Sequence, residues 1–328
     1  MAILTHMYFQ FGTRSLILPL AVHPDDTDEL KITTQGLCVF LNQTGCLRSS
    51  LFAFACCAGS IIACAPASAS AFEPHHHRVA AVETVSAASQ AGVLVRDLPL
   101  PDGSFQRVLY DAPASAVRGV IVMFPGGADD IGIEKDGQIK HGDNFVVRSR
   151  DLWTARGYGV VLVDAIDHQS MRGKRSTAAY AEVTREIVEF AHEQANAPVW
   201  VMGTSQGSIA AMNAAAHAKG PQLAGVILTE SVSILGGSHE TVFDAHPQDV
   251  RIPALVVANK DDQCKVAPPS MANAIAQSMR NTQASVLFVQ GGIVGSSNQC
   301  ASLSPHGYYG IEGKVVDDIA EWMVHVGA

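Results

Sequence analysis

From residue 92 to the end of the chain, short apolar runs alternate with longer stretches of helical periodicity. The run 119–124, GVIVMF, has no polar position, which is typical of a strand covered on both faces. The other predicted strands are 93–95, 107–110, 160–163, 198–202, 225–229, 254–257 and 285–289. The predicted helices are 145–156, 177–194, 208–219 and 314–326. This alternation predicts an α/β fold in which helices flank a mostly parallel central sheet.

Two connecting segments bear on where a ligand would bind, because ligands of such sheets lie at the carboxyl ends of the strands. The segment 231–251 between two predicted strands is short, so no large lid domain is expected. The segment 129–144 is long, polar and charged. It is either a wall of the binding site or a solvated surface loop.

The chain before residue 92 differs in composition and predicts export. Segment 51–71, LFAFACCAGSIIACAPASASA, follows Arg48, and its apolar part is too short to span a bilayer comfortably. It ends in Ala69-Ser70-Ala71, which matches an A-x-A cleavage site. We therefore predict an export signal region over 1–71, a linker over 72–91 and a folded domain over 92–328. The protein is expected to be secreted or periplasmic, with no stable membrane span.

Alternatives remain for this N-terminal region. Ile61-Ile62-Ala63-Cys64 resembles a bacterial lipobox, which would place a lipid anchor on Cys64. A buried helix over 51–65 is a further alternative. The residues before Arg48 are either an extended n-region or an over-long gene start.

The cysteines fit export. Cleavage after Ala71 would leave Cys264 and Cys300 of the seven cysteines in the chain. An isolated pair in an oxidising compartment predicts a disulfide bond, and two buried thiols are the alternative.

Composition and charge exclude several classes of function. The chain has 328 residues, 48% of them hydrophobic and 16% charged, which excludes a wholly disordered protein. Its formal net charge is −9 and it has no cluster of basic residues, so no nucleic-acid partner is expected. It has no G-x-x-x-x-G-K-[ST] loop and no metal or flavin motif, so we expect no cofactor and no metal. Nothing in the sequence specifies an oligomeric state.

The segment Gly203-Thr204-Ser205-Gln206-Gly207 matches G-x-S-x-G. It stands between a predicted buried strand and a helix rich in small residues, which is the context of a nucleophile elbow. A tight turn there would expose the Ser205 hydroxyl above the sheet. The two glycines would let neighbouring elements approach the turn closely.

With this motif the chain resembles the α/β-hydrolase superfamily over residues 92–328. The resemblance implies a nucleophile, an acid and a histidine in that order along the chain, with oxyanion-hole donors after the third strand. The segments 141–145, 199–203 and 306–310 also resemble those of a group of secreted bacterial hydrolases.

The superfamily places its histidine after the last strand, where this chain has Ser304-Pro305-His306-Gly307-Tyr308. His306 would take the proton of Ser205 and return it to the leaving group. The acid is expected after strand 254–257, at Asp261 or Asp262. Glu230, at the end of an earlier strand, is the third candidate.

Asp262 is the preferred acid because of its place relative to the two cysteines. Cys264 follows it by two residues, and Cys300 shortly precedes His306. A Cys264–Cys300 disulfide would tie the acid loop to the histidine loop and hold carboxylate and imidazole in register.

Phe124-Pro125-Gly126-Gly127-Ala128 stands where many esterases of the superfamily carry a His-Gly-Gly-Gly run. The match is partial because Pro125 replaces a polar residue. We expect the N–H near Gly127 or Ala128, and that of Gln206, to form an oxyanion hole.

Taken together, the residues predict a serine hydrolase that cleaves carboxylic esters through an acyl-enzyme. Its partner would be a small-molecule or polymeric ester. An amidase or peptidase with the same triad is one alternative. A non-catalytic binding protein of this fold is another, since fold alone does not fix function.

Overall fold

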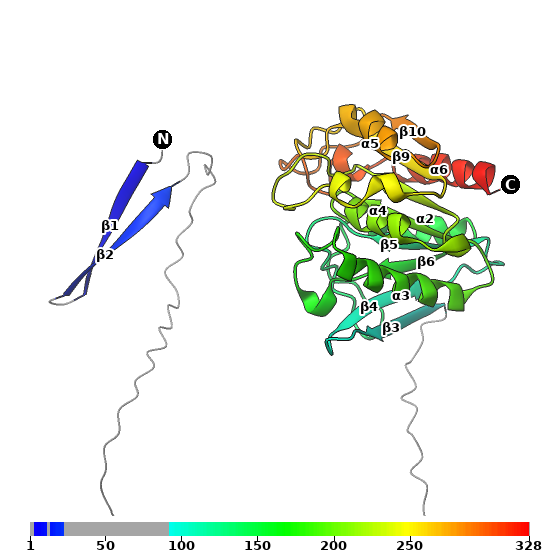
Figure 1. Cartoon of the computed structure of the whole chain (residues 1–328), viewed down its shortest axis with the longest axis horizontal. Helices are drawn as coiled ribbons and strands as arrows, with labels where there is room; N and C mark the ends of the chain where they lie inside the picture. Colours follow the sequence, from blue (N-terminus) through cyan, green and yellow to red (C-terminus); the bar gives the residue numbers. More distant parts are fainter. Residues whose placement is uncertain (1–2, 12–13, 23–91, 328) are drawn as a thin grey trace, which may run out of the picture. The chain divides into compact units, whose positions relative to one another are not determined.

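The structure is a computed structural model that describes residues 3–11, 14–22 and 92–327 (Figure 1). The first two segments form an antiparallel hairpin of β1 (Ile3–Phe11) and β2 (Arg14–Val22), which the sequence pattern did not predict. This hairpin and residues 92–327 belong to two different units of the chain. The predicted signal segment 51–71, the linker 72–91 and the lipobox cysteine Cys64 lie outside the described residues.

An eight-stranded sheet with the order β10-β9-β8-β7-β5-β6-β4-β3 forms the centre of the second unit. Figure 1 shows β3 and β4 at one end of the sheet and β9 and β10 at the other. Neighbouring strands pair in parallel from β10 to β6, whereas β4 pairs antiparallel with both β6 and β3. The predicted mostly parallel sheet is therefore confirmed. The strands are β3 (Val93–Pro99), β4 (Phe105–Asp111), β5 (Gly119–Phe124), β6 (Tyr158–Val163), β7 (Val199–Thr204), β8 (Gly225–Thr229), β9 (Ala254–Asn259) and β10 (Ala284–Val289).

Helices cover both faces of this sheet, so its central strands are buried on both sides. In β5, Val120 and Val122 join the core that also holds residues of α3, α4 and α5, while Ile121 and Met123 join the core beneath α1, α2 and α6. This explains why the run 119–124 has no polar position. The helices are α1 (Phe145–Arg148), α2 (Arg150–Ala155), α3 (Ala178–Gln194), α4 (Gly207–His217), α5 (Ala272–Ser278) and α6 (Glu312–Val326).

One predicted helix was wrong in detail, and one helix was missed. The predicted helix 145–156 is divided at Ser149, whose carbonyl accepts from the N–H groups of both Leu152 and Trp153. That double acceptance tightens the turn while Phe145 and Trp153 stay buried in one core. Helix α5 was not predicted, because its seven residues are too few to show a period.

The segments that could cover the sheet edge are short or firmly anchored. Between β8 and β9 there are only two single-turn helices, η3 (Val242–Asp244) and η4 (Pro247–Asp249), so the absence of a large lid domain is confirmed for this described segment. The long loop 129–144 is anchored by the buried Asp164, whose carboxylate accepts from the N–H groups of Ile131, Gly132 and Ile133. Because Ile131 and Ile133 are themselves buried, the loop is not simply a solvated one. No helix in the described part of the chain is both long and apolar enough to cross a membrane.

Candidate active site

Ser205 lies in the sharp turn between β7 and α4. Its φ of 52° is in the left-handed region, and its N–H donates to the carbonyl of Thr229 in β8 at 2.9 Å. A Cβ on Gly207 would lie 2.2 Å from the Phe124 carbonyl oxygen, and one on Gly203 would lie 2.1 Å from the Gly207 carbonyl oxygen. Only glycine fits at these two positions. The G-x-S-x-G pattern is therefore a packing requirement of this turn as well as a chemical motif.

Ser205, His306 and Asp262 form one chain of hydrogen bonds. His306 Nε2 lies 2.9 Å from Ser205 Oγ, and His306 Nδ1 lies 2.8 Å from Asp262 Oδ2. An ionised carboxylate can only accept, so Nδ1 carries the proton and Nε2 is left as the acceptor for the serine hydroxyl. His306 and Asp262 are buried while Ser205 is partly exposed. Such an arrangement would allow the imidazole to take the proton of the serine hydroxyl.

The other two candidate acids do not bond to His306. Asp261 accepts from the N–H of Gly291 at 2.9 Å and thereby joins the ends of β9 and β10. Glu230 Oε1 accepts from the N–H of Asn259 at 2.7 Å. Of the three acids proposed from the sequence, Asp262 alone stands in hydrogen-bond contact with the imidazole.

Glu230 nevertheless lies in the same cluster. One atom each of Glu230, Asp262 and His306 fall within 4.8 Å of one another. Glu230 Oε2 is buried and has no hydrogen-bond partner among the described residues. Burial raises the pKa of Glu230 well above its ordinary value, and the charge of Asp262 raises it further. Both effects favour the neutral form of Glu230 over the charged form.

The loops that carry the acid and the histidine are held in place covalently and by hydrogen bonds. Cys264 and Cys300 are joined by a disulfide bond, and the Cys264 N–H donates to Asp262 Oδ1 at 2.7 Å. Arg148 in α1 donates to the carbonyl oxygens of Gly307 at 2.7 Å and Ser302 at 3.2 Å. Sequence reasoning missed Arg148, because its partners are more than 150 residues away and no motif connects them.

The loop after β5 passes directly beside Ser205. A Cβ on Gly126 would lie 2.9 Å from Ser205 Cβ, so the approach requires glycine there. The following residue, Gly127, has a φ of 72°. Among the described residues, the N–H groups of Gly127, Ala128 and Gln206 all lack a hydrogen-bond acceptor. Unsatisfied donors on the loop beside a candidate nucleophile and on the residue that follows it suit an oxyanion.

A second group of acids and a histidine is spaced to hold a metal ion: Asp130, Asp164 and His168. Hydrogen bonds account for its geometry, since Asp164 binds the backbone of loop 129–144 and His168 Nδ1 lies 3.0 Å from Asp130 Oδ1.

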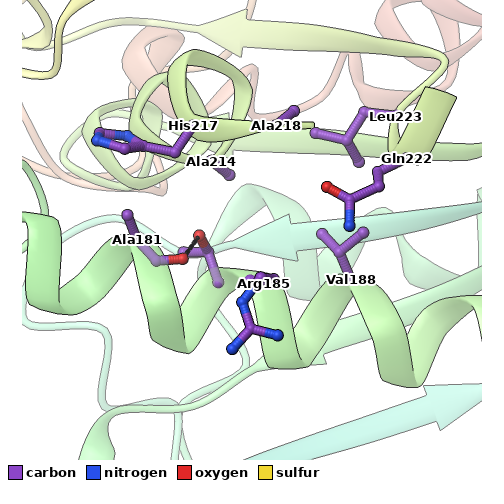
Figure 2. A pocket seen from close by; sticks show the side chains of 9 residues that line it. Ala181, Arg185, Val188, Ala214, His217, Ala218, Gln222 and Leu223 are labelled. Atoms are coloured by element: carbon purple, nitrogen blue, oxygen red, sulfur yellow. Dashed lines mark hydrogen bonds between the residues drawn. The ribbon is translucent and has the colours of Figure 1, made fainter. Parts of the chain in front are cut away.

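Two hollows lie away from Ser205. The first, between α3 and α4, has room for about one water molecule and includes His217 at the end of α4 opposite to Ser205 (Figure 2). The second is an open groove between the β3–β4 turn, the loop after β6 and α3. Neither contains a residue of the hydrogen-bonded chain. Exposed aliphatic side chains stand instead on loops that follow β8 and β10: Ile234, Leu235, Ile293 and Val294.

No protein-family model matches this chain, and no curated protein matches its sequence. Its structure is similar to that of a soluble variant of monoglyceride lipase from Saccharomyces cerevisiae, with a TM-score of 0.50 and 12% identity over 74% of this chain and 98% of that one. It is also similar to DcsB in complex with its substrate analogue, with a TM-score of 0.51 and 12% identity over 72% of this chain and all of that one. The chain has the α/β-hydrolase fold.

Proposed function

We propose that this protein is a serine hydrolase that cleaves carboxylic esters through an acyl-enzyme. The observation that carries the proposal is the continuous hydrogen-bond chain from Ser205 Oγ through His306 to Asp262. It is supported by the left-handed turn that presents Ser205 and by the N–H groups of Gly127, Ala128 and Gln206, which have no acceptor in the described part of the chain.

Each residue then has a defined role. Ser205 Oγ attacks the ester carbonyl while His306 Nε2 accepts its proton, and Asp262 stabilises the imidazolium that forms. The negative oxygen of the tetrahedral intermediate accepts from the N–H groups of Gly127 and Gln206. When the intermediate collapses, His306 returns the proton to the departing alcohol and Ser205 keeps the acyl group. Water, activated by the same histidine, then releases the carboxylic acid.

Exposed aliphatic side chains support an apolar ester as the substrate. The described residues form no large lid over the edge of the sheet where Ser205 lies, and the exposed pairs 234–235 and 293–294 stand on loops that leave β8 and β10 at that edge. Such side chains favour the acyl or alcohol part of an apolar ester over a charged substrate. Amide cleavage by the same residues is the second candidate, because the hydrogen-bond chain would serve both.

The test combines a covalent probe with paired substrates. A fluorophosphonate should add once to the wild-type protein and not to Ser205→Ala, as read by intact mass. An ester and an amide with the same acyl group should then differ strongly in rate, with the ester faster. A faster amide would replace the esterase by an amidase. A folded wild type that forms no adduct and turns over neither substrate would leave a binding protein of this fold.

We also propose that the protein is exported to the periplasm or the medium. The A-x-A site at Ala69-Ser70-Ala71 and the Cys264–Cys300 disulfide support this, since disulfides persist in oxidising compartments. The mass of the protein recovered from its producing cells tests the proposal. A start at Phe72 supports a cleaved signal, a diacylated Cys64 supports a lipoprotein, and an intact chain in the cytoplasm contradicts both.

A further inference from the structure

Arg175, in the loop between β6 and α3, bridges two segments of the candidate active site and is completely buried. Its Nη2 donates to the Gly127 carbonyl oxygen at 2.7 Å, and its Nη1 donates to Gln206 Oε1 at 3.3 Å. Its Nε donates to Asp129 Oδ2 at 2.8 Å. One guanidinium therefore holds the loop after β5 and the residue that follows Ser205.

The loop after β5 needs such an anchor. Gly127 has a φ of 72°, and Asp129, which is not a glycine, has a φ of 70°. A left-handed conformation at a residue with a side chain costs about 1–2 kcal/mol, so the loop keeps this path only where its surroundings impose it. The bonds from Arg175 to Gly127 and Asp129 fall at these two positions.

The backbone that carries Arg175 is itself fixed. Glu240 accepts from the N–H groups of Gly173, Arg175 and Ser176 at 3.0, 3.1 and 2.8 Å. Asn213 in α4 donates to the Arg175 carbonyl oxygen at 2.8 Å. These bonds fix the backbone from which the guanidinium reaches Gly127 and Gln206.

Stability alone does not account for this arrangement. A buried ion pair is often no more stabilising than apolar residues of the same volume, because desolvation of the charges offsets their attraction. A planar guanidinium, however, presents donors in fixed directions and can bind several acceptors at defined spacing. Spacing matters where two N–H groups must converge on one oxygen.

We propose that Arg175 is a positioning residue for the oxyanion hole, which sets the distance between Gly127 and Gln206 by holding both. The inference rests on the proposed function, since it presupposes acyl transfer at Ser205. Arg175 does not touch the substrate. It acts through the two residues whose N–H groups receive the developing charge.

Three variants test this: Arg175→Lys, Gln206→Ala, and Arg185→Lys as a control on the exposed face of α3. Lysine keeps the charge and can still pair with Asp129, but its single ammonium group cannot bond Gly127 and Gln206 at the same time with the geometry of a guanidinium. Active sites are titrated with the fluorophosphonate, and kcat, KM and the inhibition constant of a trifluoromethyl ketone with the same acyl group are measured per titrated site. The ketone forms a tetrahedral adduct with Ser205 whose oxygen occupies the oxyanion hole.

We expect Arg175→Lys to lower kcat about 10- to 100-fold with KM within about threefold. Its affinity for the ketone should fall by the same factor as kcat/KM. Gln206→Ala removes one contact and should lower kcat and the ketone affinity about two- to tenfold, while Arg185→Lys should leave kcat and the ketone affinity unchanged. A merely structural role would reduce the titrated fraction without changing the constants per site.

Wild-type kcat and ketone affinity per site in both Arg175→Lys and Gln206→Ala would overturn the proposal. If Arg175→Lys does not fold, Gln206→Ala decides by the same criterion. Failure of the proposed function is seen separately, as a wild-type protein that neither reacts with the fluorophosphonate nor cleaves the ester.

Discussion

Asp262 and Cys264 are joined by a hydrogen bond of 2.7 Å from the Cys264 N–H to Asp262 Oδ1, while the other carboxylate oxygen bonds to His306. Cys264 is in turn disulfide-bonded to Cys300, 36 residues further along the chain and just before the histidine loop. The covalent link therefore begins and ends beside the two residues that must stay in register.

Replacing both cysteines by alanine should destabilise the protein by about 4 kcal/mol, the chain-entropy value for a loop of this length. The rate of ester cleavage at low temperature should fall less than tenfold, because Arg148 and Ser304 still hold the histidine loop by hydrogen bonds. Urea unfolding of the oxidised wild type and of the double variant measures the first effect. Reductant should lower the stability of the wild type and leave the variant unchanged. Equal stability of the two proteins would contradict the prediction.

The choice between neighbouring acids leads to a second prediction. Asp262→Asn should lower kcat by about 10³- to 10⁴-fold, because an amide neither stabilises the imidazolium nor enforces the right tautomer of His306. Asp261→Asn is the matched control. Its amide oxygen can still accept from the Gly291 N–H, so its kcat should stay within about threefold of the wild type. Steady-state kinetics on one ester, with folding checked by circular dichroism, distinguish the two. A larger loss in Asp261→Asn would reverse the assignment.

The strand pattern and the chain order of motifs were enough to predict the fold. The run 119–124 has no polar position, which is enough to predict a strand buried on both faces. The G-x-S-x-G motif predicts a tight turn because two glycines are sterically required there. Contacts between segments that are distant in the sequence could not be predicted from local patterns. Arg175 bonds Gly127 and Gln206 from a loop with no motif, and the arginine is 48 and 31 residues from these partners.

The choice between the candidate acids could not be predicted from the sequence either, although two of them are neighbours. Asp261 and Asp262 are adjacent in a turn, and only the direction of each side chain distinguishes them. Glu230 was a candidate because some relatives of this fold place an acid there. Its proximity to Asp262, and the shift that burial causes in its pKa, depend on the pairing of β8 with β9 and could not be read from its own segment.

Glu230 should make the stability of the protein depend on pH. Its pKa is raised in the folded state. Its contribution to the free energy of unfolding is therefore fully present below the unfolded-state pKa of about 4.3 and is lost as pH rises through the folded-state pKa. Glu230→Gln does not ionise, so the free energy of unfolding of the variant should gain on that of the wild type as pH increases from about 5. Urea unfolding of both proteins between pH 5 and pH 9 measures the difference. Parallel curves over that range would show that folding does not raise the pKa of Glu230 and would contradict the prediction.

The left-handed conformation of Ser205 should destabilise the protein, although it presents the catalytic hydroxyl. Its φ of 52° costs about 1–2 kcal/mol at a residue with a Cβ, and glycine avoids this cost but loses about 0.5–1 kcal/mol more entropy on folding. Ser205→Gly should therefore be more stable than Ser205→Ala by roughly 0.5–1 kcal/mol, although both lack the hydroxyl and both should be inactive.

Ala320→Gly, at an ordinary helical position in α6, is the control, and it should lose about 1 kcal/mol. Denaturant unfolding of the three variants and the wild type gives both comparisons. Opposite signs at the two positions would place the strain in the turn that presents the serine. If Ser205→Gly were less stable than Ser205→Ala by as much as Ala320→Gly is below the wild type, the left-handed turn would carry no strain. The exposure of Ser205 would then come without a cost in folding free energy.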